Sequence, residues 1–163
     1  MTDIVFFEKP GCGGNARQRA LLEAAGHTLQ RRNLLTAHWT RDSLLPFLAP
    51  LPVAQWFNLA APRIKRGEVQ PEALDAEAAL ALLLADPLLI RRPLMQRADG
   101  TRLVGFALAE VAAFVGLSSQ PADAAALQGA LPVVLEGCAA APAGARPRAA
   151  PRAQPRPRTR PHA

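Results

Sequence analysis

The chain has 163 residues, half of them apolar, which is enough for one domain with a sizeable core and too few for two. Its formal net charge of +6 sits in residues 139–163, which hold six arginines and no acidic residue. Residues 1–138 are electrically balanced, so we expect no nucleic-acid-binding face on the folded part. No apolar run is long enough to span a membrane, no leader peptide is evident, and two cysteines do not make a disulfide framework. The sequence therefore predicts a cytoplasmic protein.

The first structural signal is an apolar run at residues 4–7, ended by Pro10-Gly11 and followed at once by a helical pattern. This order predicts a strand, a tight turn and a helix, with Cys12 at the junction. Backbone N–H groups and the helix dipole stabilise a thiolate there, and Lys9 and Arg17 add positive charge nearby. We expect Cys12 to be a reactive thiol, more acidic than a free cysteine. The alternative is a small, buried, structural cysteine.

Helical and strand patterns then alternate, which predicts the α/β class with a parallel crossover at the start. The predicted helices cover residues 13–25, 41–48 (capped by Thr40), 72–84 and 107–115, and the predicted second strand covers residues 27–33. Residues 52–62 favour a short helix that buries Trp56 and Phe57, with a partner-facing aromatic patch as the alternative. Residues 63–67 are expected to form a polar loop.

Two stretches carry a family resemblance. The residues Phe7-Glu8-Lys9-Pro10-Gly11-Cys12 resemble the start of the arsenate reductase (ArsC) and Spx-like family, a thioredoxin-fold variant, and most of all its nitrogenase-associated branch. The residues Ile90-Arg91-Arg92-Pro93 resemble the family's Ile-x-Arg-Pro element, which faces the active cysteine. The resemblance implies a small mixed sheet flanked by helices, with Cys12 and Arg92 as catalytic residues. It also implies a cis peptide bond before Pro93.

The resemblance covers about residues 3–117, so we expect three regions. These are an ArsC-like thioredoxin-fold domain over 1–117, a loosely packed segment over 118–138 and a disordered tail rich in Ala, Pro and Arg over 139–163. The apolar run at 131–138 is compatible with a terminal strand or with a loose surface segment, and we favour the second.

The chain departs from the family at three positions. Asn15 stands where a Cys-x-x-Cys pair would have its second thiol, which disfavours a Spx-like partner of the transcription machinery. The family's pattern implies three arginines, but Asn58 and Gly105 stand where two of them would fall. We expect Lys9, Arg17, Arg92 and Asn58 to contact a bound anion, and to bind it more weakly than three arginines would.

Two functions remain open from the sequence. Further segments resemble the nitrogenase-associated branch, among them residues 21–27, 33–36, 56–65 and 86–95, which implies an accessory role beside nitrogenase or its assembly proteins. The alternative is an arsenate reductase or another thiol oxidoreductase, with glutathione as co-substrate and glutaredoxin as partner. We expect no metal site, because the histidines and Cys138 have no ligand-like spacing with Cys12, and no bound cofactor.

Overall fold

The structure is a computed structural model that describes residues 1–115. Its helices and strands, in chain order, are β1 (Asp3–Glu8), α1 (Gly13–Ala24), β2 (Thr28–Asn33), α2 (Arg41–Leu48), η1 (Val53–Trp56), α3 (Pro62–Lys65), η2 (Pro71–Ala73), α4 (Ala76–Ala85), η3 (Pro87–Leu89), β3 (Leu94–Arg97), β4 (Arg102–Val104) and α5 (Leu108–Val115). The predictions for residues 118–138, for the run at 131–138 and for the tail at 139–163 lie outside the described residues.

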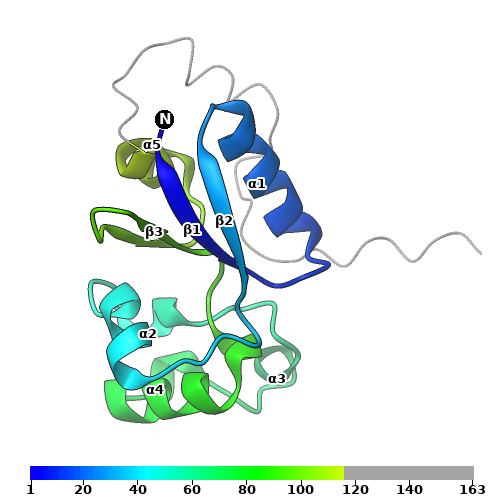
Figure 1. Cartoon of the computed structure of the whole chain (residues 1–163). Coiled ribbons are helices and arrows are strands. Elements are labelled where there is room, and N and C mark those ends of the chain that lie inside the picture. Colours follow the sequence, from blue (N-terminus) through cyan, green and yellow to red (C-terminus); the bar gives the residue numbers. More distant parts are fainter. Residues whose placement is uncertain (116–163) are drawn as a thin grey trace, which may run out of the picture.

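The four strands form one mixed sheet in the order β2-β1-β3-β4. The central strand β1 is parallel to β2, as the predicted crossover requires, and antiparallel to β3, which forms a hairpin with β4. Figure 1 shows β1 and β2 side by side with α1 next to them. The expected fold class is confirmed: this is a small mixed sheet flanked by helices.

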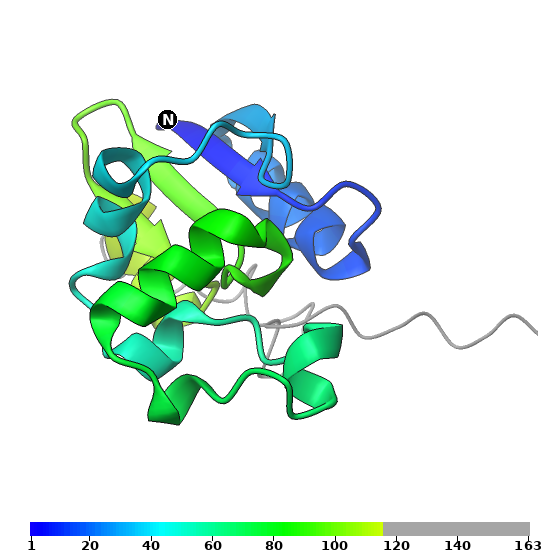
Figure 2. The ribbon, with the colours of Figure 1, turned by 90° about the horizontal axis from the view of Figure 1, so that it is seen from below.

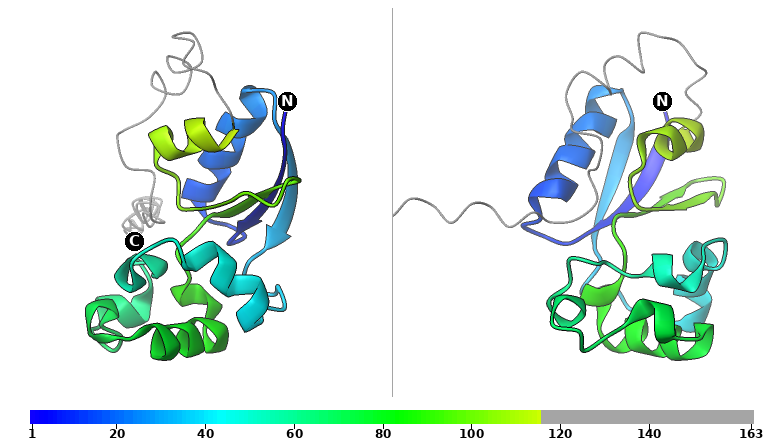
Figure 3. Two further views of the ribbon diagram at one scale, coloured as in Figure 1. Left: turned by 90° about the vertical axis from the view of Figure 1, so that its left-hand side faces the viewer. Right: turned by 180° about the vertical axis from the view of Figure 1, so that it is seen from behind.

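Alternation along β1 divides the core into two apolar clusters, one on each face of the sheet. Ile4 and Phe6 belong to the cluster on the face that α1 and α5 cover. Figure 3 shows these two helices on one side of the sheet. Phe7 points to the opposite face and packs against Trp39 and Phe47, with ring centroids 4.9 and 6.1 Å away. Both faces of the sheet are therefore covered by apolar residues around β1 and β3, whereas the edge strand β2 is mostly polar and exposed.

The helices α2, α3 and α4 form a lobe below the sheet, seen from underneath in Figure 2. The start of α2 is fixed by a capping box, in which the Thr40 hydroxyl accepts from the Ser43 N–H and the Ser43 hydroxyl accepts from the Thr40 N–H. Trp56 and Phe57 are 3% and 2% exposed, and the Trp56 ring N–H donates to Leu51 O at 2.9 Å. The prediction that these aromatics belong to the core is confirmed.

Two predicted elements differ in the structure. The helix expected over 72–84 begins only at Ala76, because the carboxylate of Asp75 accepts the Ala78 N–H at 2.8 Å and acts as N-cap; the residues before it form the separate turn η2. The loop expected over 63–67 is in part the short helix α3, which Pro62 opens at a position where its missing N–H costs nothing.

Candidate active site

Cys12 lies where the sequence predicts it, in the turn between β1 and α1. The Cys12 N–H donates to Lys9 O at 3.1 Å, and Gly11 between them has φ +75°, a conformation that glycine adopts without strain. Cys12 has an extended backbone and is the N-cap residue of α1. Its sulfur is therefore carried at the positive end of a helix of 12 residues, as the strand–turn–helix interpretation requires.

The environment of Cys12 has features of both interpretations made from the sequence. The residue is only 6% exposed, as a structural cysteine would be, but within residues 1–115 it is a member of neither apolar cluster. Its sulfur is disulfide-bonded in the structure. The sequence contains one other cysteine, Cys138, which lies outside the described residues.

The Arg92-Pro93 element lies at the same edge of the sheet as the Cys12 turn. Phe7 pairs with Leu94 in the antiparallel register, so the residues after Phe7 and those before Leu94 leave the sheet together. The peptide bond between Arg92 and Pro93 is cis, as expected from the family resemblance. The Pro93 carbonyl accepts the Gly105 N–H at 2.9 Å, which brings the start of the β4–α5 connection to this edge too.

Arg92 and Asn58 are brought together on one carbonyl. Leu88 O accepts from Asn58 Nδ2 at 3.4 Å and from Arg92 Nη1 at 3.5 Å. Both side chains are buried, at 6% and 8% exposed, and burial lowers the pKa of Arg92. The guanidinium stays charged at neutral pH all the same, because arginine does not lose its proton in proteins. The two predicted anion-binding residues are thus neighbours.

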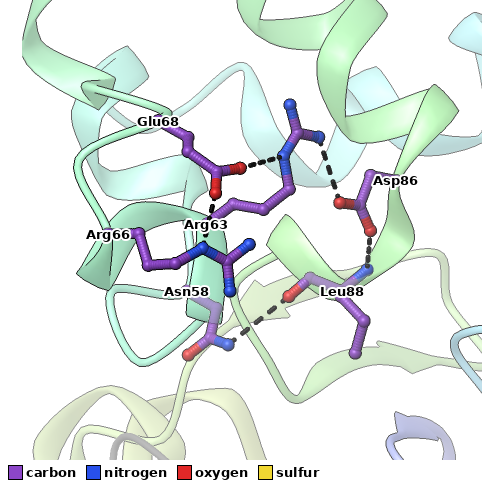
Figure 4. A network of polar contacts seen from close by, with 6 residues as sticks. All are labelled: Asn58, Arg63, Arg66, Glu68, Asp86 and Leu88. Carbon is purple, nitrogen blue, oxygen red and sulfur yellow. Dashed lines mark hydrogen bonds and ion pairs between the residues drawn. The ribbon is translucent and has the colours of Figure 1, made fainter.

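A further network holds Asn58 in place from the side of the helical lobe (Figure 4). Arg63 pairs with Asp86 at 3.2 Å, and the other carboxylate oxygen of Asp86 accepts the Leu88 N–H at 3.2 Å. The Asn58 N–H itself donates to Leu89 O at 2.8 Å. The amide of Asn58 is therefore fixed by the backbone rather than left to turn toward a ligand.

The other two predicted anion-binding residues are placed differently. Arg17 is exposed on α1, and Lys9 is half-buried. Lys9 takes part through its backbone, accepting from Cys12 and donating its N–H to Asn15 Oδ1 at 3.2 Å. Arg92 and Asn58 share the acceptor Leu88 O. Among the described residues, the side chains of Lys9 and Arg17 form no hydrogen bond or ion pair with either of them.

Residues that the sequence interpretation missed lie just beneath the Cys12 turn. Glu8, the last residue of β1, is 5% exposed and sits between two arginines, Arg19 Nε at 2.9 Å and Arg31 Nη2 at 2.9 Å. The Arg31 Nε–H also hydrogen-bonds Glu8, whereas Arg19 Nε has the distance of an ion pair without the alignment of a hydrogen bond. The signal was present in the sequence, since Glu8 has the same inward parity as Ile4 and Phe6 in a strand.

Residues 14–114 match the model of the ArsC family. The chain belongs to the ArsC family. The family's thioredoxin-like fold agrees with the mixed sheet flanked by helices.

The chain is also similar to individual proteins. An uncharacterized 15.7 kDa protein in the draG 3' region of Rhodospirillum rubrum is 52% identical over 124 residues, which cover 76% of this chain and 86% of the relative. A Bacteroides fragilis protein described as related to the ArsC family superposes with a TM-score of 0.59 and 23% identity, over 66% of this chain and 93% of its own. The arsenate reductase of Vibrio cholerae gives 0.53 and 22%, over 64% and 90%. These two structures share the fold.

Within the described part of the chain, no three side chains of His, Cys, Asp or Glu come together in a way that would hold a metal ion. The same residues include no helix that is both long and apolar enough to cross a bilayer.

Proposed function

We propose that this ArsC-family protein is an accessory protein of nitrogen fixation, in which Cys12 is the single reactive thiol of the sheet edge and nitrogenase or one of its assembly proteins is the partner. Separate segments between residues 7 and 95 resemble the nitrogenase-associated branch, and the 52% identical relative spans most of both chains.

The observation that carries the proposal is which residues stand at the positions where the family resemblance implies anion-binding arginines. Among the described residues, Arg92 is the one buried arginine at these positions. The side-chain amide of the neighbouring Asn58 already donates to Leu88 O and accepts the Ala60 N–H. Gly105 brings a backbone N–H that is bonded to Pro93 O. A tetrahedral oxyanion is best held by several bidentate guanidinium groups, so this site is a poor one for arsenate.

A thiol exchange with a protein partner demands less of the site. Cys12 is disulfide-bonded in the structure, so a thiol reductant such as glutathione must first open that bond and is itself oxidised. The freed Cys12 thiolate then attacks one sulfur of a partner disulfide, a Cys12–partner S–S bond forms, and the second partner sulfur leaves as a thiolate. The helix N-terminus stabilises the attacking thiolate. No oxyanion has to be bound at any stage of this exchange.

Two experiments test the proposal. The protein recovered from cells that are making nitrogenase is expected to carry nitrogenase or an assembly protein in a reducible complex, and Cys12→Ser is expected to abolish that complex. Recovery of the same partners with Cys12→Ser would show that the thiol is not needed. With glutathione and glutaredoxin, the purified protein is expected to reduce arsenate poorly or not at all; robust turnover abolished by Cys12→Ser would establish the reductase alternative instead.

A further inference from the structure

The first two turns of α1 contain two buried amide side chains, Asn15 and Gln18, that belong to neither apolar cluster. Asn15 and Gln18 are 2% and 1% exposed, and Asn15 Nδ2 donates to Gln18 Oε1 at 2.8 Å. Together with Leu22 they form the buried stripe of α1, at the spacing of one helix face. Two amides cost free energy in such a position unless they are hydrogen-bonded, so their partners show what they do.

The partner of Asn15 is the turn that carries the active-site cysteine. Asn15 Oδ1 accepts the Lys9 N–H at 3.2 Å, and Lys9 O in turn accepts the Cys12 N–H at 3.1 Å. Both polar groups of the Lys9 backbone are thus used, one by α1 and one by Cys12. Because the Gln18 oxygen takes the Asn15 NH₂ group, the Asn15 oxygen is the atom that faces Lys9.

We infer that Asn15 is a positioning residue for Cys12. By accepting the Lys9 N–H, the Asn15 side chain holds the Cys12 loop against the start of α1 and so fixes the sulfur at the helix N-terminus. This inference rests on the proposed role of Cys12 as a reactive thiol. A cysteine at residue 15 would have no side-chain carbonyl oxygen to accept the Lys9 N–H. Residue 15 can therefore supply either a second thiol or this hydrogen bond, but not both. The loop therefore has a hydrogen bond that orders the backbone around Cys12 in place of a resolving thiol.

The expected consequence is electrostatic. The helix N-terminus stabilises a thiolate only over the first turn, so a Cys12 turn that moves freely loses part of this stabilisation. Asn15→Ala should shift the midpoint of Cys12 alkylation upward by about half a pH unit, from the usual size of a helix-terminus interaction. The alkylation rate at pH 7 should fall about threefold in consequence.

The test measures iodoacetamide alkylation from pH 5 to 10 in the reduced full chain carrying Cys138→Ser, so that Cys12 is the one thiol. The matched control is Asn33→Ala, since Asn33 Oδ1 makes the same kind of bond, to the Leu35 N–H at 2.9 Å, at the end of the neighbouring strand. Asn33→Ala should leave the midpoint unchanged even if it lowers thermal stability.

A second variant covers the case in which Asn15→Ala does not fold. Gln18→Met keeps the volume and removes the oxygen that orients the Asn15 amide, so it should shift the midpoint in the same direction by less. An unchanged midpoint in folded Asn15→Ala or in Gln18→Met, or an equal shift in Asn33→Ala, would overturn the inference. The proposed function would survive that result, because the reducible complex with a partner is measured separately.

Discussion

The buried carboxylate beneath the Cys12 turn gives the sharpest stability prediction. Glu8→Gln removes the negative charge that faces Arg19 and Arg31 and leaves both arginines beside a neutral amide. Loss of one partner from a fully buried pair costs about 3–5 kcal/mol. The side chains of Arg19 and Arg31 are 19% and 57% exposed, however, so water screens part of the loss. We therefore expect Glu8→Gln to lower the free energy of unfolding by about 2–3 kcal/mol.

For a domain of this size, that loss corresponds to a decrease in Tm of about 8–12 °C, measured by circular dichroism at pH 7. The matched control is Glu77→Gln, because Glu77 makes a bidentate pair with Arg41 at 2.6 and 2.7 Å but its side chain is 73% exposed. The control should lower Tm by less than a third as much, since exposed pairs contribute little. Equal shifts for the two variants, or no shift for Glu8→Gln, would refute the argument that burial makes the Glu8 cluster important.

Two further predictions concern pH and oxidation. Burial, and then the charge of the N-terminal amine, lowers the pKa of His27, so below about pH 6.5 the unfolded chain binds a proton that the folded chain does not, and stability falls as the pH falls. The Tm of the wild-type protein should therefore decrease from pH 7.5 to 5.5, and the decrease should be smaller in His27→Gln. His38→Gln, at an exposed position, is the control and should show the same decrease as the wild-type protein. Identical pH profiles for all three proteins would contradict this prediction. An intramolecular disulfide of Cys12 must join Cys138, because the sequence has two cysteines. Non-reducing peptide mapping of the oxidised monomer should yield that linked peptide pair, and two free thiols in the oxidised monomer would show the prediction to be wrong.

Two features that local sequence determines were predicted correctly. The turn Pro10-Gly11 and the helical pattern after it place Cys12, and Thr40 marks the start of α2. The start of α4 was missed, because an acidic residue such as Asp75 favours the N-cap and the first turn of a helix alike. The side-chain bond to the Ala78 N–H decides between the two, and it is visible only in the structure.

The parts of the site that depend on contacts between distant residues were not predictable. The neighbourhood of Asn58 and Arg92 arises from the pairing of residues 56–58 with 89–91, which no local pattern encodes. Glu8 meets Arg31 across 23 positions of the chain. Asn15 was recognised from the sequence as a missing thiol, but its role as an acceptor for the Lys9 N–H follows from the fold alone.

The central claim is that Cys12 is a reactive thiol held at the N-terminus of α1 rather than a structural cysteine. The most direct measurement is the pH dependence of Cys12 alkylation in the reduced full chain with Cys138→Ser. The account predicts a midpoint below about 8.5, the value of a free cysteine, with the protein folded throughout. A midpoint at or above that value, or a Cys12 that iodoacetamide reaches only after unfolding, would contradict it.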